Sequence, residues 1–202
     1  MNSIENFFLE IGLNWTLSKA LPYLIALLLG AILVFFILKI IRTKKKWLRI
    51  SIGIIVFPVF FVGYFILHPI FEGDFSNNGQ KIQRTISDKE IKNNQLTVLT
   101  IPGCPYCGES MNRMKQLKLR NPKMKIDYVV VHGDSSSIEW YKSMAGDSKI
   151  DVRLATENEE MSKLAQGKYP TFVRSEEKLL TCWNNDGFGV RALDEVESVL
   201  GK

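Results

Sequence analysis

The 202-residue sequence has few side chains suited to binding transition metals, since it contains only three cysteines and two histidines. A structural zinc site normally needs four such ligands close together. Besides the pair Cys104 and Cys107, only Cys182, His68 and His132 are available, and His68 follows a long apolar run. The composition therefore disfavours a structural zinc site, and we expect no bound metal.

The sequence also lacks a spread of positive charge, although its formal net charge is +5. Six basic residues with no acid among them lie close together: Lys39, Arg42, Lys44, Lys45, Lys46 and Arg49. The rest of the chain has 20 basic against 21 acidic residues. Because nucleic-acid binding needs basic residues distributed over a face, we expect no nucleic-acid partner.

Two long stretches lack charge altogether, residues 21–38 and 50–67. About 20 apolar residues of helix span the hydrocarbon core of a bilayer. Buried core helices are the alternative, but uncharged runs of this length are rare in soluble domains. We predict transmembrane helices at 20–41 and 49–70, the second kinked at Pro58, which membrane helices tolerate.

The charges around these runs predict their orientation. Segment 1–19 carries Glu5 and Glu10 against only Lys19, and the apolar run that follows it is longer than the core of a signal peptide. We therefore do not expect a cleaved signal peptide and interpret 1–19 as a short exported segment. Positive residues stay in the cytoplasm, which makes 42–48 a basic cytoplasmic turn. We therefore expect a multi-pass protein of the cytoplasmic (inner) membrane with both termini outside, in the periplasm or its equivalent. The opposite orientation would put the cysteines in a reducing cytoplasm.

A compact C-terminal domain is expected at 95–202, after a polar tether at 71–94 that is rich in Gly, Asn and Ser. Apolar periodicity and breaker residues predict its elements. The expected strands are 96–101, 125–131, 150–154, 170–174 and 178–183. The expected helices are 104–119, one opened by 133–135 that runs to about 145, 157–165 and one from about 190. This order predicts an α/β fold, a mixed sheet flanked by helices.

The Cys-x-x-Cys pair lies between an expected strand and an expected helix. Unpaired amides and the helix dipole at a helix N-terminus stabilise a thiolate there, and the thiolate is the form that attacks a disulfide. Cys104 is thus the expected nucleophile, and Cys107, one turn later, the thiol that resolves a mixed disulfide. Pro105 presets the first helical turn, with Tyr106 following it.

Two other interpretations of the pair remain. Cu(I) could be held by both thiolates with Met111 or Met114, although methionines at helical spacing are more often core residues. A purely structural disulfide is also possible in an exported domain, but a loop this short provides little entropic stabilisation.

Residues 96–202 resemble the thioredoxin-fold superfamily, through Cys104-Pro105-Tyr106-Cys107 and through Tyr169-Pro170-Thr171. The first motif is similar to that of glutaredoxins, and the second to that of protein disulfide isomerase domains. The resemblance implies a redox-active thioredoxin-like domain in which Pro170 is cis and lies beside Cys104. It also implies that Tyr169, Pro170 and Thr171 shape the active site.

The chain departs from these families at two places. Val98 stands where thioredoxins carry a buried aspartate, and the turn 186–189 matches the glycine-rich turn of glutaredoxins poorly. Glutathione use is therefore not supported. We interpret Cys182 as a small buried residue, with a third redox partner or an intermolecular bridge as the alternative. His132 is interpreted as a loop residue.

The expected function is that of a membrane-anchored thiol–disulfide oxidoreductase acting on exported cysteine-containing proteins. It needs no external cofactor, because the dithiol itself carries two electrons. No second cysteine pair lies in the apolar runs, so a membrane redox partner is expected to recharge it. The alternatives are a tethered binding module, either a Cu(I) carrier or a chaperone, and a scaffold for a membrane partner. The direction of electron flow does not follow from the sequence.

Overall fold

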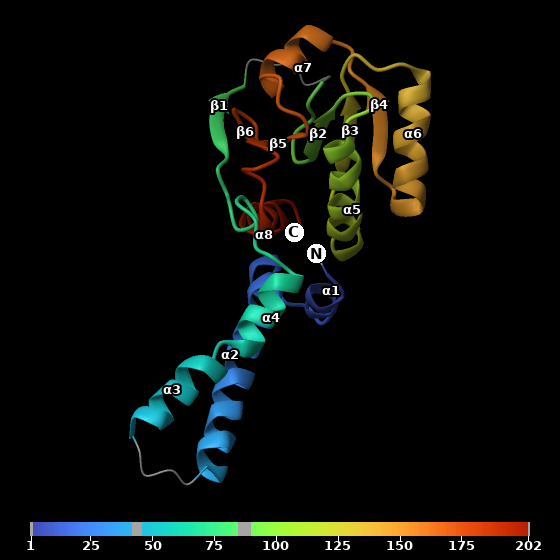
Figure 1. The fold of residues 1–202 in the computed structure, drawn as a ribbon. Coiled ribbons are helices and arrows are strands. Elements are labelled where there is room, and N and C mark those ends of the chain that lie inside the picture. The colour runs from blue at the N-terminus through green and yellow to red at the C-terminus, as the bar shows by residue number, and fades with distance from the viewer. Residues whose placement is uncertain (1, 42–45, 85–89, 202) are drawn as a thin grey trace. The chain divides into compact units, whose positions relative to one another are not determined.

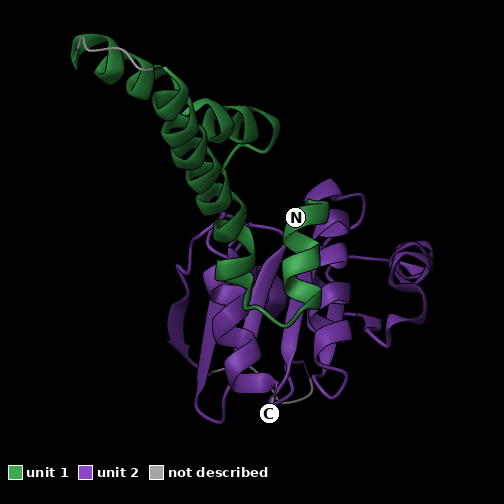
Figure 2. Cartoon of the chain, turned by 90° about the horizontal axis from the view of Figure 1, so that it is seen from below, with its two compact units in different colours: residues 1–71 green, residues 72–202 purple. Residues whose placement is uncertain are grey.

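The structure is a computed structural model that describes residues 2–41, 46–84 and 90–201. It divides into two compact units, residues 1–71 and 72–202, which are described separately (Figure 2). Parts of the expected cytoplasmic turn (42–45) and of the expected tether (85–89) lie outside the described residues.

The first unit contains four helices in its described part: α1 (Ser3–Glu10), α2 (Trp15–Ile40), α3 (Lys46–Val56) and α4 (Val59–Leu67). The α1 helix was not predicted from the sequence. Its first turn is stabilised by a capping box between Asn2 and Glu5. The α3 and α4 helices form one apolar stretch that is interrupted at Pro58. A proline has no amide for the helical ladder, so the predicted kink at this position is confirmed.

Both apolar stretches are long enough to cross a membrane. Trp15–Ile40 has 26 residues and a mean hydropathy of 2.8, and Lys46–Leu67 has 22 residues and a mean hydropathy of 2.5. Large apolar side chains are exposed along both, among them Leu28, Phe35 and Ile54. None of the most apolar part of the second stretch is buried, unlike a core helix of a soluble domain.

The second unit is built around one six-stranded mixed sheet in the order β1-β6-β5-β2-β3-β4 (Figure 1). The strands are β1 (Gln80–Gln83), β2 (Leu96–Thr100), β3 (Ile126–Val130), β4 (Asp151–Leu154), β5 (Thr171–Ser175) and β6 (Leu179–Asn184). The β2, β3 and β4 strands are parallel, and β5, β6 and β1 add antiparallel pairs. The helices are α5 (Pro105–Arg120), α6 (Ser135–Ala145), α7 (Asn158–Ala165) and α8 (Val190–Leu200), with a 3₁₀ turn at Gly146–Ser148. The predicted mixed sheet flanked by helices is present.

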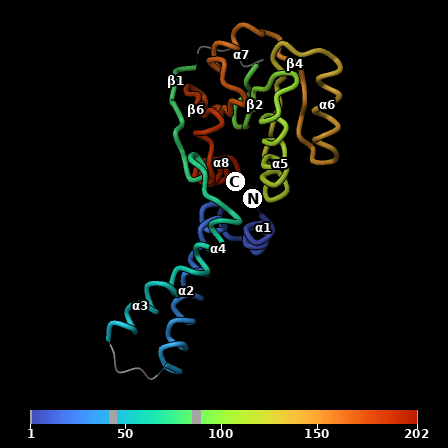
Figure 3. The backbone as a smooth tube through the Cα atoms, viewed as in Figure 1, coloured from blue at the N-terminus to red at the C-terminus, as the bar shows by residue number. Residues whose placement is uncertain are grey.

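The start of this unit differs from the expected boundary at residue 95. The β1 strand, within the expected tether, pairs antiparallel with β6 from Gln80 opposite Cys182 to Gln83 opposite Leu179. The two strands run side by side in the ribbon of Figure 1 and in the tube of Figure 3. The residues of β1 are mostly exposed and polar. This edge strand therefore has no alternation of apolar and polar residues from which it could be predicted.

The strand register separates two packed faces of the sheet. One face of the sheet carries a row of residues that are paired from strand to strand: Tyr128 on β3, Val98 on β2, Phe172 on β5 and Trp183 on β6. Tyr128 contacts α5 on that face through a hydrogen bond to its Ser110. The opposite face carries an apolar cluster with α7: Leu99, Val129, Val173, Met161 and Leu164. Burial on both faces explains why β2 and β3 carry apolar residues at consecutive positions, as at Val98-Leu99 and at Tyr128-Val129-Val130.

Candidate functional site

The two cysteines lie where β2 gives way to α5, as the sequence predicts. Gly103, with φ of +69°, turns the chain after the strand. Cys104 is the N-cap of α5 in extended conformation, and Pro105 occupies the first turn, where a missing amide costs nothing. The local sequence therefore places Cys104 at the positive end of a 16-residue helix.

Cys104 and Cys107 form a disulfide, with their Cα atoms 5.3 Å apart. The Cys107 amide donates a hydrogen bond to Cys104 Sγ at 3.2 Å, so the sulfur acts as the capping group of the helix. Cys104 retains 8% exposure, whereas Cys107 is fully buried. An external thiol or disulfide thus meets Cys104 first.

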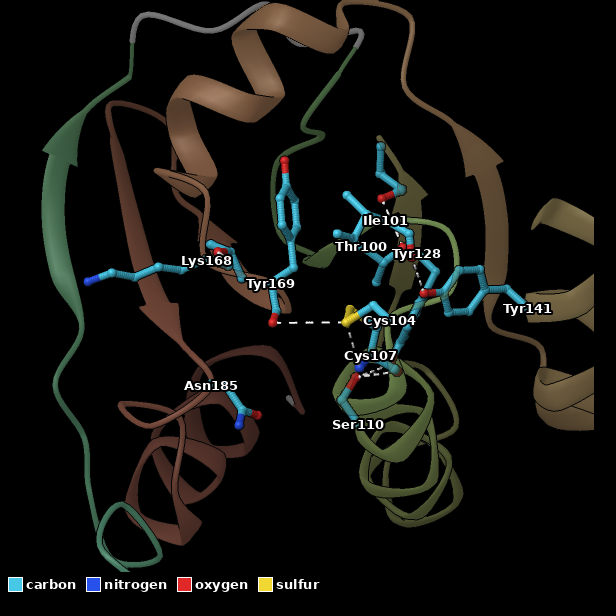
Figure 4. Close-up of a disulfide and its surroundings, with 12 residues drawn as sticks. Thr100, Ile101, Cys104, Cys107, Ser110, Tyr128, Tyr141, Lys168, Tyr169 and Asn185 are labelled. Atoms are coloured by element: carbon cyan, nitrogen blue, oxygen red, sulfur yellow. Dashed lines mark hydrogen bonds between the residues drawn. A yellow bond between two sulfur atoms is a disulfide. The ribbon is translucent and has the colours of Figure 1, made fainter. Parts of the chain in front are cut away.

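The loop before β5 lies against this disulfide. The Tyr169–Pro170 peptide bond is cis, as the resemblance implies. The carbonyl oxygen of Tyr169 lies 4.0 Å from Cys104 Sγ (Figure 4). Thr171, which begins β5, donates its hydroxyl to the carbonyl of Lys168 and so ties this loop to the strand.

A surface groove of about 520 Å³ lies next to the disulfide. Tyr106, 59% exposed, is part of its lining on the α5 side. The other lining residues come from two loops: Gly167, Lys168 and Tyr169 before β5, and Asn184, Asn185 and Asp186 after β6. Tyr106 and Tyr169 were expected here from the sequence, whereas the second loop was predicted only as a turn and Asn184 and Asn185 were not predicted. The turn-forming Asp186-Gly187 was the one local signal that could have pointed to it.

A pair of buried hydroxyl groups lies behind the disulfide on α5 and β3. The Ser110 hydroxyl donates to the Cys107 carbonyl at 2.8 Å. It also lies 2.8 Å from the Tyr128 hydroxyl (Figure 4). Because the single proton of Ser110 is used for the carbonyl, Tyr128 donates in this second bond. Burial raises the pKa of Tyr128, so it stays protonated and keeps this donor role.

No carboxylate takes the place of the buried aspartate of thioredoxins at position 98. Val98 is fully buried, and its neighbour on the adjacent strand is Tyr128. Arg113, two turns along α5 from Cys104, donates to the Phe188 carbonyl and to Asn185 Oδ1. Burial lowers the pKa of this guanidinium, and its contact with Asn185 anchors the loop that lines the groove.

Of the other candidate ligands, Cys182 and His132 lie outside α5, whereas Met111 and Met114 belong to it. Cys182 is on the face of the sheet opposite α5, against the apolar cluster with α7, and burial raises its pKa to about 12. His132 binds Ser162 Oγ through Nε2 at 3.0 Å. Met111 and Met114 are fully buried core residues. Within the described ranges, no group of three or more His, Cys, Asp or Glu side chains could hold a metal ion.

Comparison with known proteins adds little to this geometry. No protein-family model and no curated protein matches the chain. Among solved structures, a secreted Mycobacterium tuberculosis disulfide oxidoreductase homologous to E. coli DsbE is similar at 17% identity, with a TM-score of 0.40. The match covers 54% of this chain and 81% of that one. A likeness this weak decides neither the fold nor the function, so both rest on the residues described above.

Proposed function

We propose that the protein is a thiol–disulfide oxidoreductase that uses Cys104 and Cys107. The observation that carries this proposal is the asymmetry of the pair. The sulfur of Cys104 caps α5 and Cys104 is 8% exposed, whereas Cys107 is fully buried. A structural staple needs no such difference. A nucleophile with a resolving partner does need it, because the external substrate must reach one sulfur only.

The chemistry of the reduced pair follows from these positions. The Cys104 thiolate attacks one sulfur of a substrate disulfide, forming a mixed disulfide, and the other substrate sulfur leaves as a thiolate and takes up a proton. Cys107 then loses its proton and attacks Cys104 Sγ, which restores the disulfide and releases the second substrate thiol. The reverse sequence oxidises a substrate dithiol. The helix N-terminus and the Cys107 amide stabilise the Cys104 thiolate in both directions.

We propose that the substrate site around Cys104 is shaped by four residues: Tyr106, Tyr169, Pro170 and Thr171. The Tyr169 carbonyl beside Cys104 Sγ is positioned to accept a hydrogen bond from a substrate main chain bound there. The groove of about 520 Å³ leaves room for the residues that flank a substrate cysteine. Substrates are proposed to be exported cysteine-containing proteins.

We further propose that α2 and the α3–α4 stretch anchor this domain in the cytoplasmic membrane with the redox domain outside. Support comes from their length and hydropathy and from the basic cluster where they adjoin in the sequence, which includes Lys39 near the end of α2 and Lys46 and Arg49 at the start of α3. A second membrane protein would then exchange electrons with the Cys104–Cys107 pair.

The test uses the full-length protein in detergent micelles, with a reduced and an oxidised test protein as substrates. Exchange should be lost in Cys104→Ser, and Cys107→Ser should accumulate a mixed disulfide. The control Cys182→Ala should retain full activity. Activity in Cys104→Ser would refute the proposal, and tight Cu(I) binding without exchange would favour the metal-carrier alternative. The reduction potential of the pair, measured in the same preparation, decides between oxidase and reductase.

A further inference from the structure

A second hollow adjoins the groove beside the disulfide. It has a volume of about 600 Å³ and shares Lys168, Asn184 and Asp186 with that groove. Its other walls come from the end of α7, from β6 and from the segment 72–80, which wraps along the edge of the sheet. The two hollows therefore form one depression that runs from Tyr106 at the disulfide to the β1 edge.

The lining of this hollow is rich in uncharged amide groups. Asn78, Gln80 and Gln166 line it, and within the described part of the chain their side chains have no hydrogen-bond partner. Each amide offers two donors and an acceptor. An extended polypeptide presents alternating N–H and C=O groups that need such partners when they leave water. The amides can therefore bind a main chain whatever its side chains are.

The charged residues of the hollow do not favour one sign. Glu72 and Asp186 are acidic and Lys168 is basic. This mixture fits a site that accepts many polypeptides better than one that selects an anion or a cation. The Lys168–Tyr169 segment also lines the groove at Cys104. A chain whose cysteine reacts at Cys104 can continue over Lys168 into the hollow.

We propose that this depression binds an extended segment of the substrate polypeptide on one side of its reacting cysteine. The inference rests on the proposed oxidoreductase function and adds where the substrate is recognised. Binding at Asn78, Gln80 and Gln166 lowers the substrate concentration needed for half-saturation. It leaves the intrinsic reactivity of Cys104 unchanged, because these residues do not contact the disulfide.

The test uses full-length Cys107→Ser protein in micelles and peptides that carry one cysteine activated as a 2-pyridyl disulfide. The Cys104 thiolate attacks the peptide sulfur, a mixed disulfide forms, and pyridine-2-thione leaves with a measurable absorbance. A short peptide is compared with peptides extended by about eight residues before or after the cysteine. One extended peptide is expected to half-saturate the protein at a concentration roughly tenfold lower than the short one, as two or three added hydrogen bonds allow.

Substitutions then locate the binding surface. Asn78→Ala and Gln166→Ala are expected to raise the half-saturating concentration of that extended peptide by roughly three- to tenfold each, as expected for one lost hydrogen bond. The reaction of the short peptide should not change. The matched control is Gln83→Ala, an exposed amide of β1 outside the hollow, which should change neither.

The outcomes separate the two proposals. If no peptide releases thione, the oxidoreductase function itself fails. If all peptides react but short and extended peptides half-saturate alike, the function stands and the extended binding site is wrong. An equal effect of Asn78→Ala and Gln166→Ala on short and extended peptides would also overturn it, since it would indicate a change at Cys104 instead.

Discussion

Cys104 and Cys107 are expected to differ in reactivity once their disulfide is reduced. The Cys107 amide lies 3.2 Å from Cys104 Sγ at the N-terminus of α5. A hydrogen bond to a charged acceptor contributes about 1.5 kcal/mol and the helix dipole about 0.5 kcal/mol, so the thiolate gains about 2 kcal/mol. That gain gives up to roughly 30 times more thiolate at neutral pH than a cysteine without these two interactions would have. A stabilised thiolate is also a weaker nucleophile, by roughly half of this factor on a logarithmic scale, which leaves about a fivefold net acceleration.

Burial acts in the same direction. Cys107 is fully buried, so a reagent reaches it only after local opening, whereas Cys104 retains 8% exposure. Combining both effects, Cys104 should be alkylated at least about tenfold faster than Cys107 at pH 7. The assay follows iodoacetamide labelling by mass spectrometry in two full-length proteins. One is Cys107→Ser/Cys182→Ala, which keeps Cys104, and the other is Cys104→Ser/Cys182→Ala, which keeps Cys107.

Equal rates, or faster labelling of Cys107, would refute the assignment of Cys104 as the nucleophile. The third single-thiol protein, Cys104→Ser/Cys107→Ser, keeps only Cys182. It is the matched control for a partly buried thiol without a helix N-terminus, since burial raises the pKa of Cys182 to about 12. Its labelling should be slower than that of Cys104.

Three further results are expected from denaturation of the full-length protein followed by tryptophan fluorescence. Tyr128→Phe should lower the free energy of unfolding by about 1 kcal/mol, and by little when Ser110 is already alanine, because the two hydroxyls form one hydrogen bond. The free energy of unfolding should fall as pH rises from 9 towards 12, and the titration of Cys182 contributes at most about 1.4 kcal/mol per pH unit to this fall. The unfolded state ionises first, since the pKa of this thiol is raised in the folded state from 9.0 to about 12, and Cys182→Ala should reduce this slope. Glu90→Ala should cost about 3 kcal/mol, because it leaves the main-chain amides of Thr156 and Glu157 without their acceptor and removes one of the two carboxylates that pair with Arg153. A cost below about 1 kcal/mol would contradict this reasoning.

Features that depend on neighbouring residues along the chain were predictable. The two apolar stretches, the break at Pro58 and the start of α5 at Pro105 follow from composition, from the missing proline amide and from capping, all of which act within a few residues. The strands β2, β3, β5 and β6 were predicted from short groups of apolar and β-branched residues, which burial of the sheet on both faces favours. The cis bond before Pro170 came from the resemblance and not from such a pattern.

By itself, then, the sequence determined the cysteine pair, its strand-to-helix setting and the apolar stretches. Only the tertiary structure decided what surrounds the pair. It brings Tyr128 against Ser110 and places Cys182 on the opposite face of the sheet. It also pairs β1 with β6 and brings Asn78 and Gln166 into the lining of one hollow. These contacts join segments from 18 to more than 80 residues apart, and they depend on which strands pair and which faces pack. Local propensity and periodicity do not predict which distant segments pair in this way.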